Sequence, residues 1–111
     1  MRLFDDFFSK KNNDEIGKFL VDDSFGIATR TSCIVTGEVI QGNFKVNDKV
    51  KVKDENGNYF DTLCIIKGFE IHNRGEVTNV TAVKVGTRCG ILIDGMQKEK
   101  IKMWAILEKS I

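Results

Sequence analysis

The sequence predicts an all-β domain, either a sandwich or a small closed barrel, with a short helical arm in front of it. Three observations predict this class: about six short segments have the apolar and β-branched pattern of strands, Gly and Asn residues separate them, and no long helical period follows residue 20. Closure into a barrel would also remove the exposed sheet edges that a chain of 111 residues can hardly cover in another way.

The composition is that of one compact domain with a small core. The chain is 41% hydrophobic and 30% charged, and its 17 Lys and Arg residues against 16 Asp and Glu give a net charge of +1. This apolar content excludes a disordered chain, and no apolar run approaches the roughly 20 residues of a membrane helix. The N-terminus carries acids where a secretory signal has its positive and apolar regions, so the sequence predicts a cytoplasmic protein with no membrane partner.

The first 18 residues are predicted to form the helical arm, and residues 19–111 the barrel. Four apolar residues of the arm fall at i, i+1, i+4 and i+5, which gathers them on one side of a short helix; they are Leu3, Phe4, Phe7 and Phe8. Since a short amphipathic helix is only marginally stable alone, this apolar side is expected to pack on the barrel or on a partner, which includes a second copy of the chain.

From residue 19 the apolar period changes from helical to two. Over residues 45–53, Val50 and Val52 alternate with lysines, which is the pattern of a strand with one buried and one wet face. Residues 63–71 predict a second such strand, and its buried residues are expected to be Leu63, Ile65, Phe69 and Ile71. Apolar and β-branched runs predict further strands over 31–40, 77–85, 89–93 and 104–107.

Tight turns are predicted where Gly and Asn interrupt these strands. Asn56-Gly57 is the strongest short hairpin signal in the chain, and turns are also expected over 41–43 and 73–75. The segment 37–44 has two glycines at the spacing of a phosphate-binding loop, but Asn43 and Phe44 stand where that loop needs Lys and Ser or Thr. It also lies between two strands, so it is predicted to be a hairpin turn, and the chain is predicted to be no enzyme.

The cysteines and the single histidine are predicted to hold no metal and no cofactor. Cys33, Cys64 and Cys89 are an odd number, lie far apart and form no Cys-x-x-Cys pair, so they are expected to be small buried residues. His72 stands beside the turn at 73–75 and is expected on the surface. An enzyme that uses one of the thiols stays an alternative, because Cys and His partners can meet from distant positions in a sequence.

A lysine stripe is predicted on one strand face, since period-two arithmetic puts four lysines on the same side; they are Lys45, Lys49, Lys51 and Lys53. Such a row can follow a phosphate backbone with salt-sensitive contacts. It can equally be a solvated barrel wall whose lysines keep the sheet edge from pairing. Both interpretations stay open here.

Two segments of the chain resemble the second domain of translational GTPases, closest to elongation factor Tu. The first has the pattern Val-Thr-Gly-x-Val-x-x-Gly-x-x-x-Val-x-Asp over 35–48, and the second has Gly-x-x-Cys-Gly-Ile-Leu-Ile-Asp-Gly over 86–95. The resemblance covers residues 19 to about 108 and implies a small closed six-stranded Greek-key barrel. In that family the barrel does no chemistry; it helps to hold the aminoacylated 3′ end of transfer RNA or touches the small ribosomal subunit.

The resemblance also implies binding residues. Asp22, Asp23 and Phe25 fall on the family's Glu-Asp-x-Phe stretch at the aminoacyl pocket, Thr36 falls on its pocket threonine, and Arg30 matches the arginine before the second strand. Five positions differ from the pattern. Leu20 stands where the family usually has Pro, Thr29 and Thr31 replace the glycines on either side of the arginine, Glu38 replaces a common Arg, and Arg88 replaces a pocket Asn. An alternative is that Asp22, Asp23 and Thr36 serve only the turns and the barrel.

Two functions from different classes follow. The first is a non-catalytic binding module that contacts RNA, either transfer or ribosomal, or a translation protein. The alternative is a protein–protein interaction or assembly unit that uses the N-terminal aromatic arm, including self-association, with no nucleic-acid role.

Overall fold

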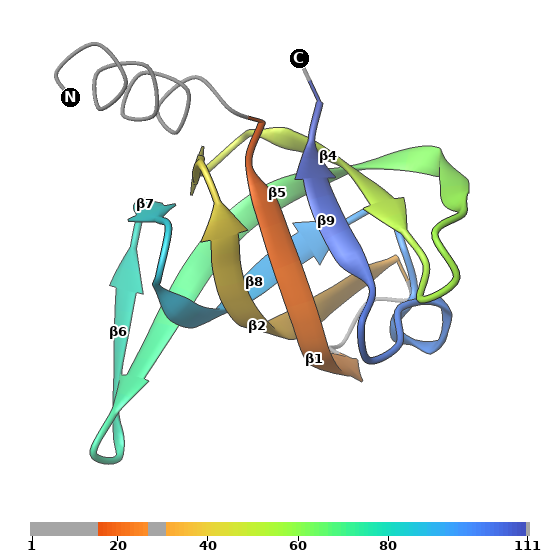
Figure 1. The fold of residues 1–111 in the computed structure, drawn as a ribbon. Coiled ribbons are helices and arrows are strands. Elements are labelled where there is room, and N and C mark those ends of the chain that lie inside the picture. The colour runs from red at the N-terminus through yellow and green to blue at the C-terminus, as the bar shows by residue number, and fades with distance from the viewer. Residues whose placement is uncertain (1–15, 27–30, 111) are drawn as a thin grey trace, which may run out of the picture.

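The computed structural model describes residues 16–26 and 31–110 and shows a closed β-barrel (Figure 1). Neighbouring strands are antiparallel in the order β4-β9-β1-β2-β8-β5, and pairing of β4 with β5 closes the ring. The barrel strands are β1 (Lys18–Gly26), β2 (Ser32–Gln41), β4 (Lys49–Lys53), β5 (Tyr59–Asn73), β8 (Arg88–Asp94) and β9 (Ile106–Lys109). The all-β class and the closed barrel are thus confirmed, and the sandwich is excluded.

Three smaller elements add to the barrel. Strand β6 (Glu76–Val80) extends the sheet beyond β5, and β3 (Asn43–Lys45) pairs with β7 (Ala82–Lys84) in a separate ribbon. The 3₁₀ turn η1 (Lys98–Lys100) precedes β9 and is the one helical element in the part of the chain that the structure describes; no helix there is long and apolar enough to cross a membrane. Residues 1–15 of the predicted arm lie outside the described residues.

The core fills the inside of the ring. On β2, buried and partly exposed residues alternate, and the closed geometry turns the inner faces of all six strands toward one another. Phe19, Phe44 and Phe69 are the largest fully buried side chains, and all three cysteines belong to the same core. Burial of one such ring contributes on the order of 2–3 kcal/mol, so the barrel stabilises itself mainly through this apolar interior.

The prediction of a single strand over residues 45–53 is wrong, because the structure has two strands there. Strand β3 ends at Lys45, and a turn follows in which Asn47 has a φ of 79°. The Asp48 carboxylate accepts a hydrogen bond of 2.8 Å from the backbone N–H of Lys45, which closes the turn before β4 begins. Asn and Asp favour such turns because they tolerate this backbone and bond to it with their side chains. Lys45 therefore belongs to a different sheet from the three lysines of β4.

The prediction that Leu63 and Ile65 lie on the buried face of β5 is wrong. Leu63 is 46% exposed, whereas Cys64 and Ile66 are fully buried. The pairing of β5 with β8 shifts between Ile66 and Gly68, where a bulge turns the next residues to the other face. Phe69 is buried after that shift, as expected.

The turn predictions hold at two of three places. Asn56-Gly57 connects β4 to β5, and a two-residue hairpin after Asn73 connects β5 to β6. The hairpin expected at 41–43 is wrong, because Gly42 only bends the chain from β2 into β3, and β3 pairs with β7. The run 77–85 is also divided, into β6 and β7, and β9 begins two residues later than expected, after Trp104 with its φ of 75°.

Candidate nucleic-acid interface

Most of the described residues predicted to bind a partner lie in two groups on the barrel, and Lys45, Asp23 and Phe25 join neither group. One group lies on the outer face of β4, and the other lies where β1, β2 and β8 run side by side. Arg30 and the arm residues Leu3, Phe4, Phe7 and Phe8 lie outside the described residues.

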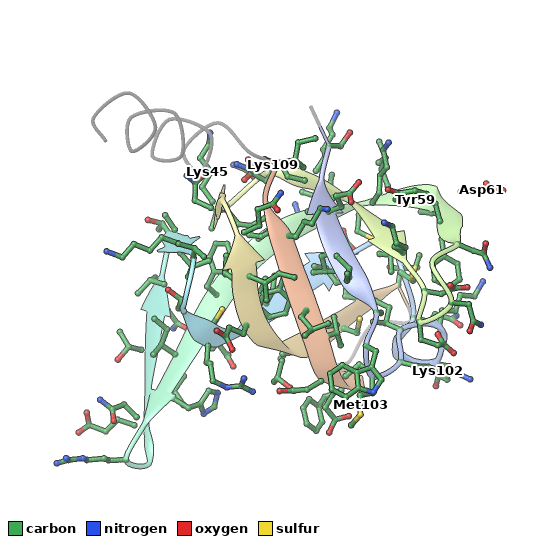
Figure 2. All side chains as sticks on the ribbon, viewed as in Figure 1. Lys45, Tyr59, Asp61, Lys102, Met103 and Lys109 are labelled. Carbon is green, nitrogen blue, oxygen red and sulfur yellow. The ribbon has the colours of Figure 1, made fainter. Side chains whose placement is uncertain are left out.

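The lysines of β4 form one open face. Val50 and Val52 are fully buried, so alternation turns Lys49, Lys51 and Lys53 outward. Because a strand rises about 3.3 Å per residue, successive lysines leave the backbone about 6.6 Å apart. We call these three lysines the lysine wall. Lys45 is on β3 instead, and in Figure 2 the labelled Lys45 and Tyr59 lie to either side of β1 and β9.

An exposed aromatic ring stands beside the lysine wall. The hairpin register places Tyr59 opposite Lys53, and the ring is 49% exposed. The ammonium nitrogen of Lys53 lies 5.0 Å from the centre of this ring, and that of Lys51 lies 5.5 Å from it. These are cation–π distances, so the tyrosine and two lysines form one unit. Sequence reasoning missed Tyr59. The hairpin predicted at Asn56-Gly57 could have indicated it, because Tyr59 follows this turn and Lys53 precedes it, and the two pair across the hairpin.

A carboxylate holds this unit in place. Tyr59 donates a hydrogen bond of 2.8 Å from its hydroxyl to Glu108 on β9, and Glu108 lies 3.9 Å from the ammonium groups of both Lys53 and Lys18. Asp61 is a second, exposed acid on the same strand as Tyr59. Lys18 and the three lysines of the wall thus stand against the carboxylates of Glu108 and Asp61, so these six side chains together carry a positive charge.

The second group contains Asp22 and Thr36, which the structure brings together. Asp22 is the extra residue of a bulge in β1, between the pairs Val21↔Gly37 and Asp23↔Thr36. The Thr36 hydroxyl donates to Asp22 Oδ1 at 2.7 Å, and Arg88 makes an ion pair with the other carboxylate oxygen. The bulge thus turns one acid toward β2 and β8.

Two of the positions that differ from the family pattern, Glu38 and Arg88, contact each other. Glu38 pairs with Arg88 in the β2–β8 register, and their charged groups lie 3.5 Å apart. Arg88 therefore lies between Asp22 and Glu38, and the acid at 38 has a basic partner within this chain. A hollow of about 250 Å³ lies next to Arg88 and is lined by Thr36, Gly37, His72, Arg88, Cys89 and Gly90.

Asp23 and Phe25 do not join this group. Asp23 is exposed and accepts a hydrogen bond of 2.8 Å from the backbone N–H of Ser24, and Phe25 is 50% exposed. Neither residue lines the hollow beside Arg88. Of the pocket residues that the resemblance implies, the structure brings together Asp22 and Thr36.

The bonds to Asp22 predict a pH dependence. The hydroxyl of Thr36, and then Arg88, hold the pKa of Asp22 below its usual range. A carboxyl with a lowered folded-state pKa contributes stability above its unfolded pKa and loses it as the pH falls through the folded value. We therefore expect Asp22→Asn to lower the free energy of unfolding at pH 7 and to have little effect near pH 2. Urea unfolding at both pH values measures this, and an equal loss at both would contradict it; Thr36→Val should reduce the pH dependence.

The buried thiols are poor nucleophiles. Burial raises the pKa of Cys33, Cys64 and Cys89 to about 11, so very little thiolate exists near neutral pH. The exposed His72 lies 3.6 Å from a carboxylate oxygen of Glu70. Within residues 16–26 and 31–110, no group of three or more His, Cys, Asp or Glu side chains is placed to hold a metal ion.

Thiol alkylation is expected to be slow in the native chain. Because all three cysteines are in the core, iodoacetamide at pH 8 should react at least roughly a hundredfold faster in urea than in buffer. Mass spectrometry over time measures the labelled fraction. Rapid native labelling of one cysteine would contradict this and would favour the thiol enzyme.

The fold of this chain is similar to part of a protein of known structure. No family model matches the chain. Two structures of translation elongation factor SelB from Methanococcus maripaludis match it, the apo form and the complex with the GTP analogue GppNHp, each with 24% sequence identity and a TM-score of 0.70. The chain shares its fold with part of this translation elongation factor. The match covers 96% of this chain and 23% of each SelB chain, so the chain spans about a quarter of that protein's length. A closer relation to elongation factor Tu stays a prediction.

Proposed function

We propose that this chain is a non-catalytic binding module that acts in translation and contacts RNA through the lysine wall. The observation that carries the proposal is the outer face of β4, where three outward lysines stand beside a half-exposed tyrosine. The fold adds support, because a translation elongation factor contains the same barrel.

The chemistry of this face suits a single RNA strand. Each ammonium group that contacts a phosphate releases a bound counterion, which gives affinity that falls with salt. A base can stack on an exposed aromatic ring, and such stacking contributes about 1–3 kcal/mol. Because Glu108 accepts a hydrogen bond from Tyr59 and lies close to Lys53, both groups are already oriented before RNA arrives.

The group around Asp22 supports a different role. Its carboxylate is bonded on both oxygens, by Thr36 and by Arg88, and Glu38 is also close to Arg88. A ligand at this place would have to break these bonds. The proposal therefore assigns RNA contact to β4 and a structural role to Asp22 and Thr36.

Binding to RNA tests the proposal directly. The purified chain is titrated into a fluorescent single-stranded RNA and a structured RNA at about 50 and 200 mM salt, with ribosomal particles in a parallel sedimentation assay. We expect binding at the lower salt that weakens by roughly tenfold or more at the higher salt. No binding to any of these at the lower salt would overturn the proposal.

A further inference from the structure

An apolar groove lies beside the β3–β7 ribbon, away from the lysine wall. Its volume is about 430 Å³, and its apolar lining includes Phe44, Val83, Ile71 and Val80. Phe44 and Val83 belong to the core, whereas Ile71 and Val80 are only partly buried against it. Two exposed lysines also line it, Lys45 and Lys84. The groove thus combines an apolar surface with two ammonium groups.

The first described residues of the chain, Ile16 and Gly17, lie beside two residues that line this groove, Asn43 and Phe44. Gly17 packs so closely on β3 that a Cβ there would lie 2.6 Å from the Asn43 carbonyl oxygen and 3.1 Å from the Phe44 ring. The carbonyl oxygen of Ile16 accepts a hydrogen bond of 2.7 Å from Gln41, which ties this point to the end of β2. Residues 1–15 therefore connect to the barrel next to Phe44, which itself lines the groove.

The segment is long enough to reach the groove. Phe8 is eight residues before Ile16 and can lie up to roughly 27 Å from it in an extended chain. A helical path would shorten this to about 12 Å. Both lengths allow contact with a groove whose lining includes Phe44, the ring on which Gly17 packs.

The chemistry of the segment complements that of the groove. The sequence Leu3-Phe4-Asp5-Asp6-Phe7-Phe8 places two acids between two apolar pairs. A cavity of roughly 150 Å³ holds one benzene molecule, so the groove, at about 430 Å³, has room for at least two phenyl rings. We propose that residues 3–8 of the same chain bind this groove, with phenylalanine rings on its apolar lining and Asp5 and Asp6 facing Lys45 and Lys84.

This proposal is independent of the RNA proposal. It gives Lys45 a role on β3, whereas the lysine wall consists of Lys49, Lys51 and Lys53 on β4. It also names this groove as the surface for the alternative function, which is interaction through the aromatic arm. The two proposals can fail separately, because the test below needs no RNA.

Methyl NMR of the full chain tests the occupant of the groove. The variant Phe7→Ser/Phe8→Ser removes two rings, and Phe25→Ser is the matched control, because Phe25 is an exposed phenylalanine that does not line the groove. We expect the first variant to shift the methyl signals of Ile71, Val80 and Val83 and to lower Tm by roughly 5 °C or more. The control should leave these signals in place. Unchanged groove signals in Phe7→Ser/Phe8→Ser would overturn the proposal.

A charge exchange tests the pairing of acids with lysines. Lys45→Glu/Lys84→Glu and Asp5→Lys/Asp6→Lys should each move the groove signals toward those of the variant without rings, and the fourfold combination should restore them. These substitutions are at exposed groove positions or outside the barrel strands, so the barrel should still fold. Failure of the combination to restore the signals would contradict the pairing. A dimer mass in light scattering, with groove signals that change on dilution, would place the segment on a second copy and overturn binding within one chain.

Discussion

Gly37→Ala is expected to unfold the barrel. A Cβ at this position would lie 1.9 Å from the Leu20 carbonyl oxygen and 2.9 Å from the Leu20 carbonyl carbon, and both are backbone atoms of the neighbouring strand. No side-chain rotation relieves such a contact, so β1 and β2 must separate beside the bulge at Asp22. We expect a loss of about 4 kcal/mol or more, which is most of the stability of a small domain. Circular dichroism and urea unfolding measure it.

Gly68→Ala is the matched control. Gly68 also lies in a barrel strand beside a bulge, but no atom beyond its own chain neighbours lies within 4 Å of the position that its Cβ would take. The free energy of unfolding should change by less than about 1 kcal/mol. Equal stability of the two variants would show that β1 and β2 are not packed as described.

Lys49→Glu/Lys51→Glu is expected to abolish most of the RNA affinity. Both lysines are exposed on β4, so the change leaves the core intact while it replaces two ammonium groups with carboxylates. We expect the Kd for single-stranded RNA to rise by roughly tenfold or more at about 50 mM salt. Fluorescence anisotropy measures the Kd, and urea unfolding confirms that the variant is folded.

The control for Lys49→Glu/Lys51→Glu reverses two charges outside the lysine wall. Lys84→Glu/Lys102→Glu alters the net charge equally, and both of these lysines are exposed on segments that do not pair with β4. If binding uses the lysine wall, this variant should keep most of its affinity. An equal loss in both variants would indicate attraction by net charge alone.

Local patterns predicted much of the fold because their causes are local. The Asn56-Gly57 turn and the alternation of Val50 and Val52 with lysines depend on neighbouring residues, and the structure has both. The buried face of β5 was predicted wrongly because a bulge after Ile66 depends on how β5 meets β8. Lys45 was placed on the wrong strand because the lysine alternation continues across a turn that Asn47 and Asp48 make.

The candidate site was harder to predict because its contacts join distant strands. Glu38 and Arg88 looked like two separate differences from a family pattern, and only the β2–β8 register shows that they are partners. No sequence pattern indicated Tyr59 as a binding residue, and only the structure shows that it lies beside Lys53 and bonds to Glu108. Period-two arithmetic finds which residues share a face, but it does not find which strands are neighbours.

The salt dependence of RNA binding is the most direct test of the proposed function. The Kd for one single-stranded RNA is measured from about 50 to 200 mM salt for the native chain and for Lys49→Gln/Lys51→Gln. Since each contact with a single-stranded phosphate contributes about 0.7 to the slope of log Kd against log salt, the slope should fall by roughly 1.4 in the variant. An unchanged slope, or no binding by the native chain, would contradict RNA contact through β4.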